Sequence, residues 1–287
     1  MARLFDLAVL RAGLRSPVDQ RAIPAYCITF GKVAVGVLFL LLFGFTTTPM
    51  VWAIMIASGL LIPVGMLVSW LGNTRTGGAF QAISLVYGQG VMGFIFLLPI
   101  LATPFPYQDG LLDAVDRAMG FDWLSLHQRT RAFAPWLLWA YETFRWQHIV
   151  VIAVLFATRQ DSRAWQFVNA SAVALLITSL LAMIVPAKGA AVLFGVSDGE
   201  RWVPILDYLK GGGRELTGSM FTGLTTFPSY HAAACVLFAW ALWTTWLRWP
   251  FLLLNMVMLL ATVTEGSHYL APIYHKAGRG FGGWMLM

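Results

Sequence analysis

Two histidines, His231 and His268, are the residues whose type and spacing most clearly suggest chemistry. An imidazole titrates near neutral pH, so it can act as a nucleophile, a general acid or a general base. His231 opens one apolar stretch and His268 closes the next, with Arg248 at the turn between them. Because each crossing spans about 30 Å of hydrocarbon, a down-and-up hairpin returns the chain to the same depth. We therefore expect both rings at one membrane face.

A single histidine near a membrane interface is usually a hydrogen-bonded structural residue. Two at matched depth beside a basic loop favour catalysis instead. In that loop, Lys210 and Arg214 flank the glycines 211–213. Cations stabilise the oxygens of a phosphoryl group, and glycines let backbone N–H groups approach it closely. Lys210 and Arg214 are the first candidates for phosphate binding, with Arg201 and Lys188 in reserve, and the alternative is a flexible surface loop with solvated charges.

A second polar group lies inside an apolar stretch and suggests a different function. Glu142, Arg145 and His148 fall within residues 135–157. Glu142 and Arg145 are three residues apart and can pair on one helix face. Intramembrane charges are candidates for ion or solute pathways, so a transporter or channel is an alternative. The other interpretation is that this region is interfacial.

The composition requires lipid around much of the chain. Its 287 residues are 59% hydrophobic and only 11% charged, with 13 Trp and 20 Phe. A soluble domain is closer to a quarter charged, and abundant aromatic residues are typical of membrane interfaces. The net charge of +6 then indicates contact with anionic head groups and a phosphate site, with no nucleic-acid partner. Cys27 and Cys235 are interpreted as packing residues.

We expect an all-α fold: a polytopic transmembrane helical bundle with about six to seven spans in a single membrane-embedded domain over residues 1–287. A span needs about 20 mostly apolar residues. The stretches that meet this need are residues 28–46, 50–71, 80–102, 135–157, 164–186, 227–245 and 250–268. Residues 1–25 are interpreted as a cytoplasmic leader. Residues 111–119 have acids on one side and apolar residues on the other, which suits a helix lying in the interface.

The basic residues predict an orientation. Arg75, Arg159, Arg163 and Arg248, with the arginines before residue 25, fall on one side of the predicted bundle. Basic residues in short loops mark the cytoplasmic side. Both histidines and the long loops 103–132 and 187–225 then face outward. For a bacterial chain, this is the periplasmic face of the inner (plasma) membrane.

Two motifs resemble those of a known family. Residues 227–231, Phe-Pro-Ser-Tyr-His, resemble the Pro-Ser-x-His motif of the type 2 phosphatidic acid phosphatase superfamily. Residues 266–270, Gly-Ser-His-Tyr-Leu, resemble its last motif. The branch that looks most similar contains inositol phosphorylceramide synthases and related inositolphosphotransferase-like membrane proteins. That branch also lacks an Arg six residues before the second His, where this chain has Thr262, and has a loop similar to Leu112–Trp123. The resemblance covers most of the chain, but only the histidine motifs are specific.

The resemblance implies a mechanism without a metal or cofactor. His268 would attack phosphorus and form a phosphohistidine, and His231 would protonate the leaving oxygen. Ser229 would join Lys210 and Arg214 in binding the phosphate, although these two do not match the spacing of the family's first motif. The substrate would be a phospholipid, a sphingolipid or a polyprenyl phosphate. Water or a lipid alcohol would accept the phosphoryl group, so phosphatase and phosphotransferase both stay open.

The last motif departs from the family pattern at one position. The family has an Asp four residues after the second His, where it accepts a hydrogen bond from the nucleophile, and this chain has Pro272. In serine proteases, replacing the orienting acid costs about 10⁴ in turnover. Glu265 is a possible substitute. Residues 273–287 also depart from the expected apolar helix, so we expect a truncated or frame-shifted eighth span. A catalytically impaired, lipid-binding relative is therefore a further alternative.

Overall fold

The computed structural model describes residues 17–197, 199 and 201–270. The first part of the predicted leader, Pro272 and the aberrant segment 273–287 lie outside the described residues. Within the described part, the chain is helical apart from two strands of two residues each. This confirms the all-α class.

Four helical segments are long and apolar enough to cross a membrane. Each lies where the sequence predicts a span, and two of the four are interrupted. They are η1 (Gln20–Ala22) with α2 (Ile23–Leu42), α3 (Pro49–Gly59) with α4 (Leu61–Trp70), α5 (Thr74–Val91) with α6 (Phe94–Leu101), and α11 (Asp161–Ile184). Leu41 and Ile56 on these segments are 76% and 65% exposed. Such large apolar exposure fits a surface in contact with lipid.

Three further predicted spans are apolar helices shorter than a full crossing: α10 (Phe144–Ala157), α14 (Tyr230–Ala241) and α15 (Arg248–Thr264). At 1.5 Å per residue, a helix needs about 20 residues to cross the hydrocarbon. By length alone the described part of the chain therefore contains four spans, fewer than the six to seven expected. Another helix, α9 (Ala134–Glu142), precedes α10 and extends that predicted span.

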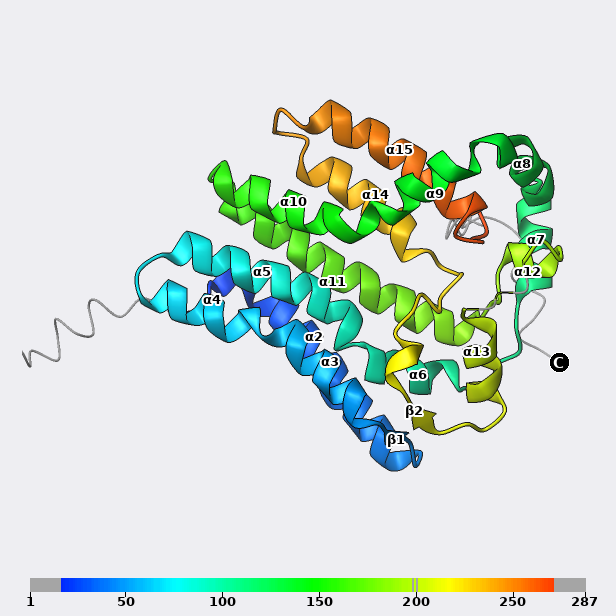
Figure 1. The fold of residues 1–287 in the computed structure, drawn as a ribbon, viewed down its shortest axis with the longest axis horizontal. Helices are drawn as coiled ribbons and strands as arrows, with labels where there is room; N and C mark the ends of the chain where they lie inside the picture. The colour runs from blue at the N-terminus through cyan, green and yellow to red at the C-terminus, as the bar shows by residue number, and fades with distance from the viewer. Residues whose placement is uncertain (1–16, 198, 200, 271–287) are drawn as a thin grey trace, which may run out of the picture.

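The helices that carry the two histidines pack together. α14 packs against α15 and α11, and α15 also packs against α9. In Figure 1, α5, α10, α11, α14 and α15 run roughly along the long axis of the molecule. The start of α14 and the end of α15 point toward the same end of the bundle.

That end of the bundle is capped by short elements from the two long loops (Figure 1). They are α7 (Asp109–Ala118), α8 (Trp123–Thr130), α12 (Ala190–Leu193) and α13 (Val203–Lys210). The same loops also contain η2 (Arg131–Phe133) and η3 (Gly218–Met220), which packs against α3. Two strands, β1 (Thr46–Thr47) and β2 (Glu215–Leu216), pair in parallel. This pairing ties the second long loop to the turn between the first two predicted spans. No sequence pattern predicts this pairing, because two-residue strands carry no alternating pattern.

Candidate active site

The rings of His231 and His268 lie close together. Their centroids are 6.3 Å apart, and the ring planes are inclined at 49°. A nucleophile in a near-attack position lies about 3–3.5 Å from its target. A general acid lies within about 2.6–3.2 Å of the atom that it protonates. Two imidazoles that share one phosphoryl group must therefore lie within several ångströms of each other, as these two do.

The Pro-Ser-Tyr-His segment places His231 at the start of α14. Ser229 is the N-cap of this helix, because its Oγ accepts a hydrogen bond from the backbone N–H of Ala232 at 3.2 Å. His231 is thus the second residue of the helix. The N-terminal end of a helix carries a partial positive charge and favours anions. Ser229 therefore has a structural role as a cap, and its hydroxyl proton is still available to a ligand.

His268 lies beyond the last residue of α15 and is held by a backbone carbonyl. Its Nδ1 lies 2.6 Å from the carbonyl oxygen of Thr226. A carbonyl can only accept a hydrogen bond, so Nδ1 carries the proton and Nε2 keeps the lone pair needed for attack. The ring is 3% exposed, and burial lowers the pKa of His268 to about 4. The imidazole is therefore neutral at pH 7.

The partner carbonyl is itself fixed by a neighbouring loop. The Thr226 hydroxyl donates to the carbonyl oxygen of Ala187 at 2.7 Å in a buried hydrogen bond. The residue before His268, Ser267, has a left-handed backbone with φ of 59°. Such conformations are costly outside glycine and persist where the surroundings impose them. The histidine thus sits in a constrained segment of backbone.

His231 is enclosed by two aromatic rings that the sequence did not single out. Tyr141 stacks on it with a centroid separation of 4.4 Å, and Phe144 lies 4.1 Å away. These residues flank Thr143, where α9 ends and α10 begins. The packing of α9 on α15 brings them to the site. No local sequence pattern identifies them, because their role depends on how distant helices pack.

The polar residues Glu142, Arg145 and His148 lie in two different environments. Glu142 and Arg145 pair at the surface, and the His148 ring is buried. Arg145 Nε lies 2.8 Å from Glu142 Oε2, which confirms that the two pair on one face. Their side chains are 75% and 39% exposed, so they face outward rather than line a path through the bundle. His148 is buried, and its Nδ1 lies 3.1 Å from the Phe144 carbonyl oxygen.

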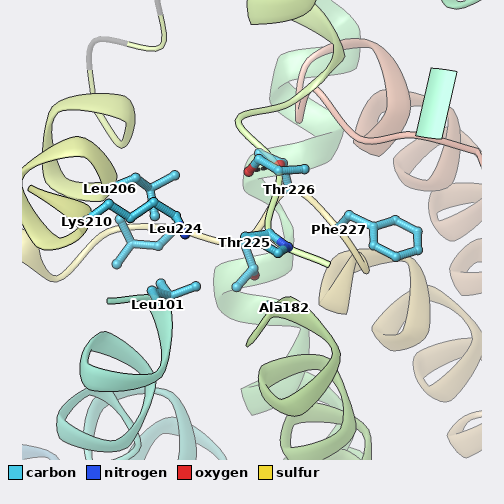
Figure 2. A pocket seen from close by; sticks show the side chains of 10 residues that line it. Leu101, Ala182, Leu206, Lys210, Leu224, Thr225, Thr226 and Phe227 are labelled. Atoms are coloured by element: carbon cyan, nitrogen blue, oxygen red, sulfur yellow. Dashed lines mark hydrogen bonds between the residues drawn. The ribbon is translucent and has the colours of Figure 1, made fainter. Parts of the chain in front are cut away.

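Lys210 borders a narrow pocket that also reaches the segment before the Pro-Ser-Tyr-His motif. Figure 2 shows Lys210 at one side of this pocket and Thr226 and Phe227 at the other. The Lys210 amine donates to the carbonyl oxygens of Thr103 and Phe105 at 3.0 and 2.6 Å. Partial burial lowers the pKa of Lys210. The structure records no contact between its amine and either site histidine.

Two of the other three candidate cations, Arg214 and Lys188, bind groups outside the histidine site. Arg214 donates to the carbonyl oxygen of Gly213 at 2.9 Å and lies over the Phe45 ring at 4.8 Å. Lys188 forms an ion pair with Asp207 at 2.8 Å. Arg201 is exposed. The structure therefore brings the histidines and Ser229 together but leaves the cations at a neighbouring loop.

Glu265, the candidate orienting acid, caps the C-terminal end of α15 and is partly buried. Within the described residues, no hydrogen bond or ion pair of its carboxylate is recorded. The Nδ1 position of His268 is taken by the Thr226 carbonyl. Among the same residues, no group of three or more His, Cys, Asp or Glu side chains is arranged to hold a metal ion.

An all-α bundle of apolar helices with two histidines at one end defines a class of membrane protein suited to acid–base or nucleophilic chemistry. The family model of the PAP2 superfamily matches residues 111–273, more than half of the chain. The chain therefore belongs to the PAP2 superfamily, whose members are generally phosphoric-ester hydrolases. This membership indicates a function of the phosphatase or phosphotransferase type. No curated protein and no solved structure showed a significant similarity to the chain.

Proposed function

We propose that this chain is a membrane-embedded lipid phosphatase or phosphotransferase that works through a phosphohistidine at His268. The observation that carries the proposal is the 6.3 Å separation of the His268 and His231 rings. The Nδ1 hydrogen bond to Thr226 supports it, because that bond directs the Nε2 lone pair away from the carbonyl. The substrate would be a phospholipid, a sphingolipid or a polyprenyl phosphate at the outer face of the plasma membrane.

In the first step, Nε2 of His268 bonds to phosphorus as the bond between phosphorus and the lipid oxygen breaks. Protonated His231 gives its proton to that leaving oxygen. In the second step, water or a lipid alcohol attacks phosphorus and the P–N bond breaks. Neutral His231 takes the proton of the attacking hydroxyl, which returns both rings to their starting states. Burial and the neighbouring imidazole of His268 lower the pKa of His231 to about 3, so this ring is neutral without substrate. The negative charge of a bound phosphate raises that pKa, and His231 carries the proton in the complex with substrate.

The phosphate in this scheme is bound by Ser229, Lys210 and Arg214. The Ser229 cap lies two residues before His231 at the helix start, where anions are favoured. Lys210 borders the pocket that reaches Thr226. Its amine would have to exchange the carbonyls of Thr103 and Phe105 for phosphate oxygens. An ammonium is attracted more strongly to a phosphate anion than to a neutral carbonyl, so a bound substrate competes with these carbonyls for the amine.

The test uses the full chain purified in lipid nanodiscs. Radiolabelled phosphatidic acid reports hydrolysis as released phosphate, and labelled phosphatidylinositol with ceramide reports transfer as a new phospholipid. We expect turnover of at least one of these lipids, and its loss in both His268→Ala and His231→Ala. A labelled polyprenyl phosphate is assayed in the same way. No turnover of any of the three lipids, or full turnover in His268→Ala, would contradict the proposal.

A further inference from the structure

The short helix α7 presents two acids to the segment that contains His268. Asp109 and Asp116 are seven residues apart, which is about two helical turns and places both on one face. Asp116 is 1% exposed. The opposite face carries Leu111, Val115 and Met119, which are exposed apolar residues. The helix therefore buries Asp116 beside the apolar Leu112 and exposes apolar residues beside Arg117.

The two acids hold the two residues that follow His268. Asp116 Oδ2 accepts a hydrogen bond from the backbone N–H of Leu270 at 2.9 Å. Asp109 Oδ1 accepts one from the Tyr269 hydroxyl at 2.8 Å. Both acceptors are carboxylates, and hydrogen bonds to ionised groups are shorter and stronger than neutral ones. The two acids of α7 thus hold the segment that directly follows His268.

Asp109 also fixes the residue before His268, through an intervening loop. Its carboxylate accepts from the backbone N–H groups of Lys188 and Gly189 at 3.0 and 2.8 Å. The next two residues of that loop, Ala190 and Ala191, donate their N–H groups to the carbonyl and hydroxyl oxygens of Ser267 at 3.0 and 2.9 Å. These bonds hold Ser267 in its left-handed conformation.

We propose that Asp109 and Asp116 are positioning residues that aim the His268 ring at phosphorus. The inference rests on the proposed function of His268 as nucleophile. The carboxylates bind the residues that flank the imidazole, Asp109 at Tyr269 and at the loop before Ser267 and Asp116 at Leu270, so both act through the segment on either side of the ring. Catalytic geometry is demanding, since a displacement of about 1 Å can cost about 10²-fold in rate. Loss of Asp109 lets Ser267 relax from its left-handed conformation. Loss of Asp116 releases the backbone at Leu270, and either change turns the ring.

The same helix supplies a matched control. Asp113 lies between the two acids in sequence and pairs with Arg117 at 2.8 Å. It donates or accepts no recorded hydrogen bond with the described residues 187–191 or 266–270. Replacing Asp113 therefore removes a carboxylate from α7 and leaves the bonds around His268 in place.

The experiment measures single-turnover formation of the phosphoenzyme and steady-state kinetics on the full chain in nanodiscs. We expect Asp109→Ala and Asp116→Ala to lower kcat by about 10²-fold with KM changed less than about twofold. Asp109→Asn and Asp116→Asn should recover part of the rate, because the amide oxygen still accepts a hydrogen bond. Asp113→Ala should stay within about twofold of the wild type. Equal kcat in all three alanine variants would overturn the inference.

A second measurement does not depend on substrate. Diethyl pyrocarbonate modifies accessible imidazoles, and mass spectrometry gives its rate at His268. We expect modification about tenfold faster in Asp116→Ala than in the wild type, at unchanged helix content, and no change in Asp113→Ala. A wild type that forms no phosphoenzyme would contradict the proposed function alone. Equal modification rates in the two variants would overturn the positioning role by itself.

Discussion

The Nδ1 atom of His268 lies 2.6 Å from the carbonyl oxygen of Thr226. This contact fixes the tautomer that leaves Nε2 free. A carbonyl carries only a partial charge, so it orients the ring but stabilises a positive imidazole less than a carboxylate does. The consequence is an imidazole that is well oriented and neutral, with a basicity reduced by burial, which suits the nucleophilic role that we propose for it.

The dependence of activity on pH below 7 tests whether the His268 imidazole is neutral. Protonated His268 has no lone pair for attack, and burial lowers its pKa to about 4. We therefore expect kcat/KM for an aryl phosphodiester with a good leaving group, whose phosphate does not titrate in this range, to be retained as pH falls from 7 to 5. Such a substrate needs little help from a general acid, so the profile reports the nucleophile. A loss centred near pH 6.5, the ordinary histidine value, would contradict burial of this ring.

Stability should depend on pH for the same reason. The unfolded chain takes up a proton at His268 below about pH 6.5, whereas the folded chain resists it down to about pH 4. As the pH is lowered through this window, the free energy of unfolding therefore decreases, by up to about 1.4 kcal/mol per pH unit. Thermal melts of the wild type and His268→Gln at pH 7, 6 and 5 isolate this group. We expect the wild type to lose more stability than the variant, and parallel losses would disprove the assignment.

Gly189 tests whether the backbone around His268 sets the rate. It has φ of 109°, and an added Cβ would lie 2.4 Å from Ser267 Oγ. Gly189→Ala must displace Ser267, so we expect kcat to fall by about 10²-fold. Gly195 also has a positive φ, but a Cβ there meets no atom within 4 Å. Gly195→Ala should cost about 1 kcal/mol of stability from backbone strain and leave kcat unchanged. Similar kcat in both variants would argue against control by this segment.

Lys210 tests the assignment of the phosphate-binding group. A hydrogen bond to a charged group contributes about 1.5 kcal/mol or more, so we expect Lys210→Met to raise KM for a lipid phosphate by about tenfold. Arg129, an exposed cation on α8, provides the control, and Arg129→Met should leave KM unchanged. If KM is the same in the wild type and Lys210→Met, then Lys210 only ties its loop to Thr103 and Phe105.

The sequence predicts the parts of this molecule that depend on local pattern. Apolar length predicts where the helices lie, and amphipathic spacing predicts the helix at residues 111–119, which is observed as α7. The three-residue spacing of Glu142 and Arg145 predicts their ion pair. The apolar stretches on either side of Arg248 predict a helical hairpin with His231 and His268 at the same end. In the structure their ring centroids are 6.3 Å apart.

The remaining features depend on how loops fold onto helices. The Thr226 carbonyl is a backbone group, which every residue has, so no residue type marks it as the partner of His268. Tyr141 reaches His231 only because α9 packs on α15. The Lys210 amine is held by carbonyls of a different loop. The lengths of α14 and α15 also differ from the prediction, because hydropathy does not locate caps such as Ser229.

The central claim is that His268 carries the phosphoryl group, and mapping that group tests it most directly. The full chain is quenched in alkali during turnover, digested and sequenced by mass spectrometry. We expect phosphohistidine at His268, and its absence in His268→Ala. In His231→Ala it should form slowly from a lipid phosphate but at close to the normal rate from a good-leaving-group aryl phosphate. Phosphate found on His231 or on another residue, or turnover without any phosphoenzyme, would contradict the account.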